Sequence, residues 1–229
     1  MRAVFCDLKE SAVGEVVIIS GDRAHHLQVV RVKIDEEVLV LNGMGQRFFS
    51  KVIEVTKKEV VLKILKIESL VPLHQINLAI ALPKKDAFED ILRISVELGI
   101  GHIYPLSSEF SQYQYAPSER IDRLLESALV QSNNLYLPQI AKQTQLNDYI
   151  NQLSGSLVYF SASPAPLVGT IDTSSEITVL IGPEAGFSAR EEEQIQASKN
   201  IKIIHLPTPI LRAPTAVATS VGYLLGRLS

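Results

Sequence analysis

Apolar residues recur along the chain with two different patterns, and the pattern changes near residue 70. Before it, alternating apolar and polar positions rich in β-branched residues predict five strands, over residues 3–8, 16–19, 38–41, 48–55 and 60–67. Asn42-Gly43 and Lys57-Lys58 stand where hairpin turns should fall. Residues 20–31 predict a short helix with Ser20 as its N-cap. Residues 1–70 are therefore predicted to form a small β-rich domain.

After the linker expected at 70–74, buried strands alternate with amphipathic helices. Apolar runs predict strands over 76–82, 102–106, 157–160, 178–181 and 201–206. Helical spacing of apolar residues predicts helices over 83–98, 118–132, 146–153 and 215–228, and a further helix starting at Ser188. This order predicts, for residues 71–229, a parallel α/β sheet with helices on both faces.

Two of these strands end in unusual loops. The run Thr178–Ile181 stops at Gly182-Pro183 and leads through Glu184-Ala-Gly186-Phe187 into a Ser-x-x-Glu capping box. Without a Cβ, Gly182 and Gly186 are expected to let the backbone approach a ligand closely. The strand 201–206 leads into a segment stiffened by three prolines, 207–216. Because ligand sites form at the carboxyl ends of parallel strands, these two loops are the candidate site.

The two loops resemble the signature of the RsmE family of ribosomal RNA methyltransferases, which belongs to the SPOUT superfamily. That signature reads I-G-P-E-G-G-F-S-x-x-E, then L-G-x-x-I-L-R-x-E-T-A. The resemblance implies a deep trefoil knot in the second domain and a homodimer packed through that domain and its last helix. It also implies transfer of a methyl group from S-adenosylmethionine (SAM) to N3 of a uridine in small-subunit (16S) rRNA. The cofactor residues it implies are Leu180, Ile181, Gly182, Pro183, Glu184, Gly186, Leu206, Ile210, Leu211, Arg212 and Thr215.

The first domain carries a second resemblance to that family. His25-His26-Leu27 and the following Val30-Arg31 are similar to H-H-L-x-x-V-L-R-x-x-x-G-D, with Asp35 in place of the glycine. This implies a PUA-like β-barrel that binds RNA, with contacts from His25 and Arg31 and, from the second domain, Lys84. From the residues alone, the same stretch could equally be a solvated helix face, with Arg31 paired to Asp35 or Glu36.

The middle of the chain follows the family less closely. Residues 84–89, KKDAFE, match K-G-D-x-x-E, but charged residues of the family are replaced at several positions: Ile94, Phe110, Val130, Asn134 and Pro214. Two functions therefore remain open, an active methyltransferase and a SAM- or RNA-binding paralogue that has lost methyl transfer. No catalytic base can be assigned, and Asp86, Glu89 and Glu97 are candidates only by position.

Composition narrows the other possibilities. A net charge of −3 and a pI near 6.0 argue against strong non-specific RNA binding. The single cysteine, Cys6, excludes an internal disulfide or a Cys-based zinc site, and methyl transfer from SAM requires no metal. No apolar run could cross a membrane and no signal sequence opens the chain, so a cytoplasmic protein is expected. Glycine-rich and lysine-containing phosphate-binding motifs are absent, which argues against an unrelated nucleotide-binding protein.

Overall fold

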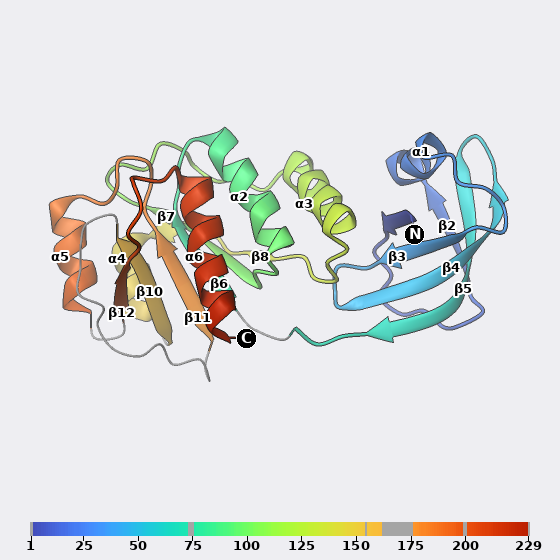
Figure 1. Ribbon diagram of the computed structural model, residues 1–229. Helices are drawn as coiled ribbons and strands as arrows, with labels where there is room; N and C mark the ends of the chain where they lie inside the picture. The colour runs from blue at the N-terminus through green and yellow to red at the C-terminus, as the bar shows by residue number, and fades with distance from the viewer. Residues whose placement is uncertain (1, 73–75, 154, 162–175, 199–200, 229) are drawn as a thin grey trace. The chain divides into compact units, whose positions relative to one another are not determined.

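The computed structural model describes residues 2–72, 76–153, 155–161, 176–198 and 201–228 (Figure 1). The chain forms two compact units. The first contains residues 1–72 and 122–137, and the second contains residues 73–121 and 138–229. The linker expected at 70–74 lies partly outside the described residues.

The first unit is built on a curled five-stranded sheet, in the order β1-β3-β4-β5-β2. All five predicted strands are confirmed: β1 (Arg2–Phe5), β2 (Val16–Ser20), β3 (Glu37–Leu41), β4 (Gln46–Val55) and β5 (Glu59–Ser69). Strand β1 pairs with β3 in parallel, and the other pairs are antiparallel. The β4–β5 register shifts twice, at Phe49/Ser50 and at Val52/Glu54. Such irregularities increase the local twist, which accounts for the curl of the sheet.

Alternate positions along these strands fill the core of the unit. On β5, Val60, Leu62 and Ile64 are all buried, as the two-residue period of a strand requires. Helix α1 (Gly21–Val29) packs Ala24 and Leu27 into the same core. Ser20 is the N-cap residue of α1, but its side chain makes no capping hydrogen bond, so that part of the prediction was wrong. The strand pattern and the apolar face of α1 are therefore sufficient for this fold, and a capping hydrogen bond from Ser20 is not needed.

A segment distant in sequence completes the first unit. Helix α3 (Glu119–Ser132) enters it at Asp122, and the chain leaves it after Leu137. The backbone N–H of Gly45 donates to Leu135 O at 2.8 Å, and that of Leu137 donates to Gly43 O at 2.9 Å. The Tyr136 ring occupies the place of a side chain at Gly45, since a Cβ there would lie 2.2 Å from the tyrosine hydroxyl oxygen.

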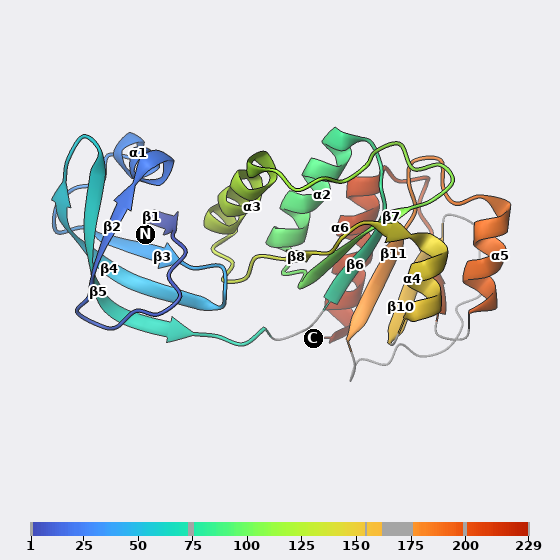
Figure 2. The same cartoon turned by 180° about the vertical axis from the view of Figure 1, so that it is seen from behind.

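The second unit is an α/β layer structure, as the alternation predicts (Figure 2). Its strands are β6 (Ile76–Ala81), β7 (His102–Ser107), β8 (Gln139–Ile140), β9 (Thr144–Gln145), β10 (Ser156–Ser161), β11 (Ile177–Ile181) and β12 (Ile201–His205). Its helices are α2 (Lys85–Glu97), the start of α3, α4 (Leu146–Gln152), α5 (Ala189–Ala197) and α6 (Ala213–Leu228). The short strands β8 and β9 were not predicted.

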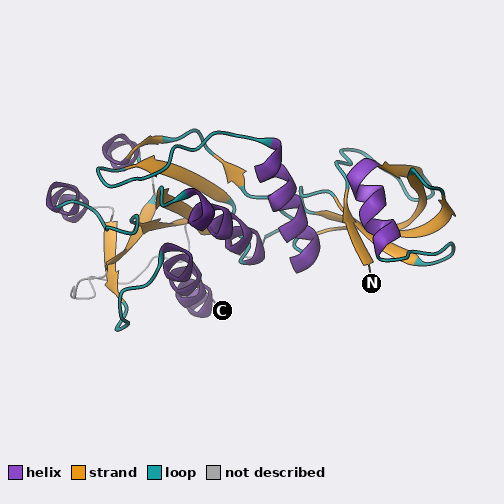
Figure 3. Ribbon diagram, turned by 90° about the horizontal axis from the view of Figure 1, so that it is seen from above, coloured by secondary structure: helices purple, strands orange, loops and turns teal. Residues whose placement is uncertain are grey.

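All pairs in this sheet are parallel, in the order β12-β10-β11-β6-β7-β8, with β9 also on β7. Helices cover both faces, with α2 packed on α6 and α4 packed on α5 (Figure 3). Every residue of β6 and of β11 is buried, as expected for strands covered on both sides. Because the strands are parallel, the segments that follow β6, β7, β11 and β12 all leave the sheet at one edge.

None of the helices in the described part of the chain is long and apolar enough to cross a membrane.

Candidate active site

The loop between β11 and α5 is fixed at both of its ends. At its start, the Gly186 N–H donates to Pro183 O at 2.9 Å and closes a tight turn. At its end, the predicted capping box is confirmed: Ser188 Oγ accepts from the Glu191 N–H, and a Glu191 carboxylate oxygen accepts from the Ser188 N–H at 2.9 Å. Two otherwise unpaired donors of the first turn of α5 are thereby satisfied.

The two glycines of this loop are also required by the local structure. A Cβ on Gly182 would lie 3.3 Å from Cε2 of Phe187, within the same loop. Gly186 has φ +75°, a conformation that residues with a side chain rarely adopt. Phe187 is buried, and its ring meets the Tyr159 ring edge-on, with the centroids 5.6 Å apart. Gly182 therefore makes room for the phenylalanine that holds the loop against the sheet, and the expected close approach of a ligand to the two glycines stays a prediction.

Two carboxylates connect this loop to neighbouring strand ends. Glu184 Oε1 accepts from the backbone N–H of Lys84, which follows β6, at 3.3 Å. Glu191 Oε1 accepts from the backbone N–H of Glu109, which follows β7, at 2.9 Å. Glu191 is buried, whereas Glu184 is exposed. The loop is thus attached to the segments after β6 and β7, which lie far from it in sequence.

The loop between β12 and α6 has a different character. Pro207, Thr208, Pro209 and Ile210 are all exposed, and Ile210 retains 88% of its accessible surface. The Thr208 N–H donates to Leu206 O at 2.7 Å, a bond within the loop itself. Pro214 stands in the first turn of α6, where its missing N–H costs nothing.

A cavity of about 220 Å³ lies between these two loops. Eight predicted cofactor residues line it: Ile181, Gly182, Pro183, Glu184, Gly186, Leu206, Ile210 and Leu211. The three others do not, since Leu180 is buried in the core beneath the α4 and α5 face, and Arg212 and Thr215 are exposed. The cavity is also lined by Ala185, Thr208, Pro209, Ala213 and Ala216, which lie within the two candidate loops, and by residues that the sequence reasoning missed: Tyr159, Phe160, Ser161 and Ser220.

A signal for the missed residues was present. Strand β10 runs parallel to both β11 and β12, so its last residues, Tyr159–Ser161, had to end at the same edge. Ser220 recurs at helical spacing with Ala213 and Ala216 and lies on the same face of α6.

Tyr159, on β10, is a buried aromatic residue of the cavity wall. Its hydroxyl donates to a carboxylate oxygen of Glu192 on α5. Burial raises the pKa of Tyr159 well above the usual tyrosine value, and the bond to Glu192 raises it further. The hydroxyl therefore stays protonated and acts as a hydrogen-bond donor at neutral pH.

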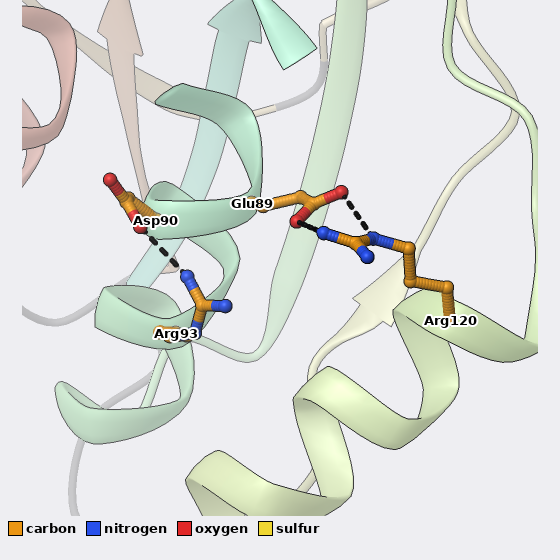
Figure 4. Close-up of polar contacts among 4 residues, drawn as sticks. All are labelled: Glu89, Asp90, Arg93 and Arg120. Atoms are coloured by element: carbon orange, nitrogen blue, oxygen red, sulfur yellow. Dashed lines mark hydrogen bonds and ion pairs between the residues drawn. The ribbon is translucent and has the colours of Figure 1, made fainter. Parts of the chain in front are cut away.

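The three positional candidates for a catalytic base differ sharply. Asp86 and Glu97 are exposed. Glu89 is buried and accepts two hydrogen bonds from Arg120, from Nε at 2.9 Å and from Nη2 at 2.7 Å (Figure 4). Because of those bonds, the pKa of Glu89 lies below its usual value, so this carboxylate is a weak proton acceptor. Among the described residues, no group of three or more His, Cys, Asp or Glu could hold a metal ion.

The predicted RNA-binding residues His25, Arg31 and Lys84 are all exposed. Arg31 directly follows α1 and its turn, with φ +56°, and the structure gives it neither of the two expected ion-pair partners. Asp35 instead pairs with Lys51 at 2.7 Å, and Glu36 pairs with Arg2. Asp35 has φ +70°, which explains why the family pattern has glycine there. Arg31 and His25 belong to the first unit and Lys84 to the second.

The positions that depart from the family pattern are scattered over both units. Phe110 follows β7 and is 41% exposed. Val130, on α3, lines a cavity of about 460 Å³ within the first unit, together with Phe5, Arg23 and His26. Ile94 lies half-buried on α2. The lost charges therefore do not gather at the cavity between the two loops, where only Pro214 lies in an adjoining turn, although Ala185 replaces a family glycine on the cavity wall.

Comparison with known proteins defines the class. Residues 70–225 match the family described as an RNA methyltransferase domain, and residues 19–65 match the RNA methyltransferase PUA domain. The fold and the site are thus those of an RNA methyltransferase with an N-terminal PUA domain.

The relatives identify the family within that class. The chain is similar to ribosomal RNA small subunit methyltransferase E of Aquifex aeolicus, at 30% identity over 227 residues, covering 94% of this chain and 96% of that protein. The enzyme of the same name from Rickettsia conorii is 27% identical over 216 residues, covering 91% and 88%. The chain belongs to the ribosomal RNA small subunit methyltransferase E family, which confirms the resemblance seen in the sequence.

Solved structures agree on the fold. The crystal structure of ribosomal RNA small subunit methyltransferase E from Neisseria gonorrhoeae, bound to S-adenosyl methionine, superposes with a TM-score of 0.90 at 23% identity, covering 99% of this chain and 98% of that one. A predicted RNA methyltransferase from Thermotoga maritima superposes with a TM-score of 0.77 at 25% identity, over the full length of both chains.

Proposed function

We propose that this protein transfers a methyl group from SAM to N3 of a uridine in 16S rRNA of the small ribosomal subunit. The observation that carries the proposal is the cavity between the β11–α5 and β12–α6 loops, at the carboxyl edge of a parallel sheet. Membership of the family supplies the class of reaction. The choice of N3 of a uridine as the methylated atom rests on the family resemblance and is the most detailed part of the proposal.

The residues around the cavity suit SAM chemically. Ile181, Leu206 and Leu211 offer apolar surface for a flat adenine ring. Small side chains on α6, at Ala213, Ala216 and Ser220, leave open a space that larger residues would fill. We assign cofactor binding to the eight predicted residues on the cavity wall, and we retain Leu180, Arg212 and Thr215 as neighbours that support the two loops.

When bound, SAM supplies a methyl group already activated on a sulfonium, so the protein's own task is mainly orientation. Glu184 and Glu191 attach the β11 loop to the segments after β6 and β7, and Tyr159 with Phe187 holds its base. Glu89 is paired with Arg120 and is a poor base, which leaves Asp86 and Glu97 as positional candidates for removing the N3 proton.

The first domain is assigned to RNA binding, within a division of the chain into 1–70 and 71–229. His25, Arg31 and Lys84 are exposed and available to RNA. Arg31→Ala should weaken rRNA binding and reduce its salt dependence by about one phosphate contact, with SAM affinity unchanged. An unchanged affinity and slope would remove Arg31 from the interface. The matched control is Lys51→Ala, whose ammonium already pairs with Asp35.

Three further features of the proposal come from the family: a trefoil knot in the second domain, a cytoplasmic location beside the ribosomal substrate, and a homodimer packed through α6. Ala218 and Gly222 on α6 are small enough for close packing of two helices. A single-subunit mass at micromolar concentration would refute the dimer.

The decisive experiment supplies purified protein and labelled SAM to small subunits that lack the modification, and then maps the methyl group. Methylation at a uridine N3 is the expected result.

A second candidate function is a SAM- or RNA-binding paralogue without transfer activity, favoured by the lost charges at Phe110 and Asn134. SAM and subunit binding without methylation would establish that alternative.

A further inference from the structure

Glu89 and Arg120 form an ion pair whose two partners differ greatly in exposure. The Glu89 side chain keeps 7% of its accessible surface, whereas that of Arg120 keeps 68%. Both carboxylate oxygens are used, by Nε and by Nη2 of the same guanidinium. Figure 4 shows the pair joining the middle of α2 to the first turn of α3.

A neighbouring pair on the same helix provides a contrast. Arg93 binds Asp90 with one hydrogen bond at 2.7 Å, and both side chains are largely exposed, at 48% and 61%. Such a surface pair, three residues apart on a helix, is common and contributes little. The Glu89–Arg120 pair differs from it because it joins two helices and contains a buried carboxylate (Figure 4).

Burying a carboxylate is costly, and an apolar side chain at the Glu89 position would join α2 to α3 without that cost. What the carboxylate adds is orientation. With Nε and Nη2 both engaged, the guanidinium plane is fixed, and Nη1 is left outside this pair on a side chain that is mostly in solvent. An arginine held in this way is pre-organised to bind a second anion, since little rotamer freedom is left to lose.

The surroundings are suited to an anion. Arg120, through its hydrogen bonds, and Lys85, one helical turn before Glu89, both lower the pKa of Glu89. Lys84, already a candidate for RNA contact, is exposed immediately before α2. Asp86 lies near Arg120 and offsets part of this positive charge, which favours a single local contact over a broad basic surface.

We propose that Arg120 binds a backbone phosphate of the RNA substrate and that Glu89 is the positioning residue that aims it. This inference rests on the proposed function, because it requires an RNA substrate. It adds a phosphate contact on the methyltransferase domain to a chain whose net charge is −3 and whose pattern has lost other family cations.

The test compares Arg120→Ala with Arg93→Ala, which removes a cation of similar exposure from α2. Binding of a single-stranded RNA fragment of the substrate is measured between about 0.05 and 0.5 M salt. Loss of one phosphate contact lowers the slope of log affinity against log salt by about 0.7, so the defect should be about fivefold larger at the low-salt end. Arg93→Ala should match wild type. Equal slopes for all three proteins would overturn the inference.

Two further variants separate phosphate binding from a purely structural role. Glu89→Gln keeps the charge of Arg120 but weakens its orientation, so RNA affinity should fall while the salt slope stays at the wild-type value. Glu89→Gln combined with Arg120→Ala leaves no unpaired buried carboxylate, and it should show the reduced slope of Arg120→Ala with wild-type SAM affinity. A double variant that regains the wild-type slope would overturn the inference. Failure of wild type itself to bind RNA would refute the proposed function instead.

Discussion

The two loops that enclose the cavity are held in place by opposite means. The β11–α5 loop depends on groups far away in the sequence: Glu184 reaches the Lys84 N–H, and Glu191 reaches the Glu109 N–H. The β12–α6 loop is exposed from Pro207 to Ile210 and is stiffened by its own prolines. One loop owes its shape to the folded protein around it, and the other owes its shape largely to its own covalent structure.

This difference determines how stability and the cavity respond to a substitution in each loop. Removing a contact of the β11–α5 loop should cost folding free energy and alter the cavity together. Removing a proline from the β12–α6 loop should cost little stability, because the effect is mainly on the freedom of the unfolded chain. Four substitutions test the comparison, beginning with the one of largest expected effect.

Phe187→Ala should be the most damaging. The ring is buried between Gly182 and Tyr159, and loss of a buried phenylalanine costs about 3–5 kcal/mol. Urea unfolding measures the stability and calorimetry measures the SAM affinity, which should fall steeply. Phe49→Ala, which removes a half-buried ring on β4 of the first unit, is the control for general loss of apolar area. A Phe187 variant as stable as wild type would show that the loop does not depend on this ring.

Glu191→Ala should cost about 2 kcal/mol, because it removes half of the capping box and also the acceptor of the Glu109 N–H. Glu193→Ala is the matched control, an exposed glutamate two residues further along α5. Differential scanning calorimetry should show a lowered melting temperature for Glu191→Ala only. Equal melting temperatures for the two variants would contradict the long-range attachment.

Tyr159→Phe should cost about 1 kcal/mol at neutral pH through loss of the bond to Glu192. The pKa of Tyr159 is raised in the folded state, so its contribution is complete below the ordinary value of about 10 and is lost as pH rises through the folded value. The gap between wild type and variant in free energy of unfolding should therefore narrow above pH 10. Tyr149, whose pKa is raised to about 12, is present in both proteins. The free energy of unfolding of both proteins should therefore still fall at alkaline pH. A gap that stays constant up to pH 12 would exclude the Tyr159 hydroxyl as its source.

Pro209→Ala should have the smallest effect on stability, about 0.4–1 kcal/mol, through the unfolded state. Its effect on SAM affinity should be larger in proportion, since a looser loop must be ordered on binding. Pro117→Ala, at an exposed proline before α3, should cost similar stability with no change in SAM affinity. Parallel behaviour of the two proline variants would mean that the stiffness of this loop is unimportant for the cofactor.

The same contrast explains how much could be predicted from the sequence. Local signals were sufficient for the strands of both units, for the Ser188–Glu191 capping box and for the position of the two loops. The role of Tyr159 could not be predicted, because it depends on a contact between β10 and the β11–α5 loop. That of Gly182 depends on how the loop folds around Phe187, which no periodicity reports. The Glu109 attachment joins residues 82 positions apart, and no periodicity reports such a contact. Strands β8 and β9 have two residues each, too few to show any alternation.

The divided first unit has a consequence for how the protein is made. Residues 122–137 belong to that unit, and Tyr136 and Leu137 fill the places beside Gly45 and Gly43. A ribosome that has released residue 72 must add 65 more residues before the last of that segment appears, which takes roughly 3–13 s at common synthesis rates. For that interval the nascent sheet has its own core but lacks its covering segment, and the apolar ring of Phe5 beside Gly43 faces solvent. The N-terminal part of the chain is therefore made first, but its folding cannot be completed until residues 122–137 have been synthesised.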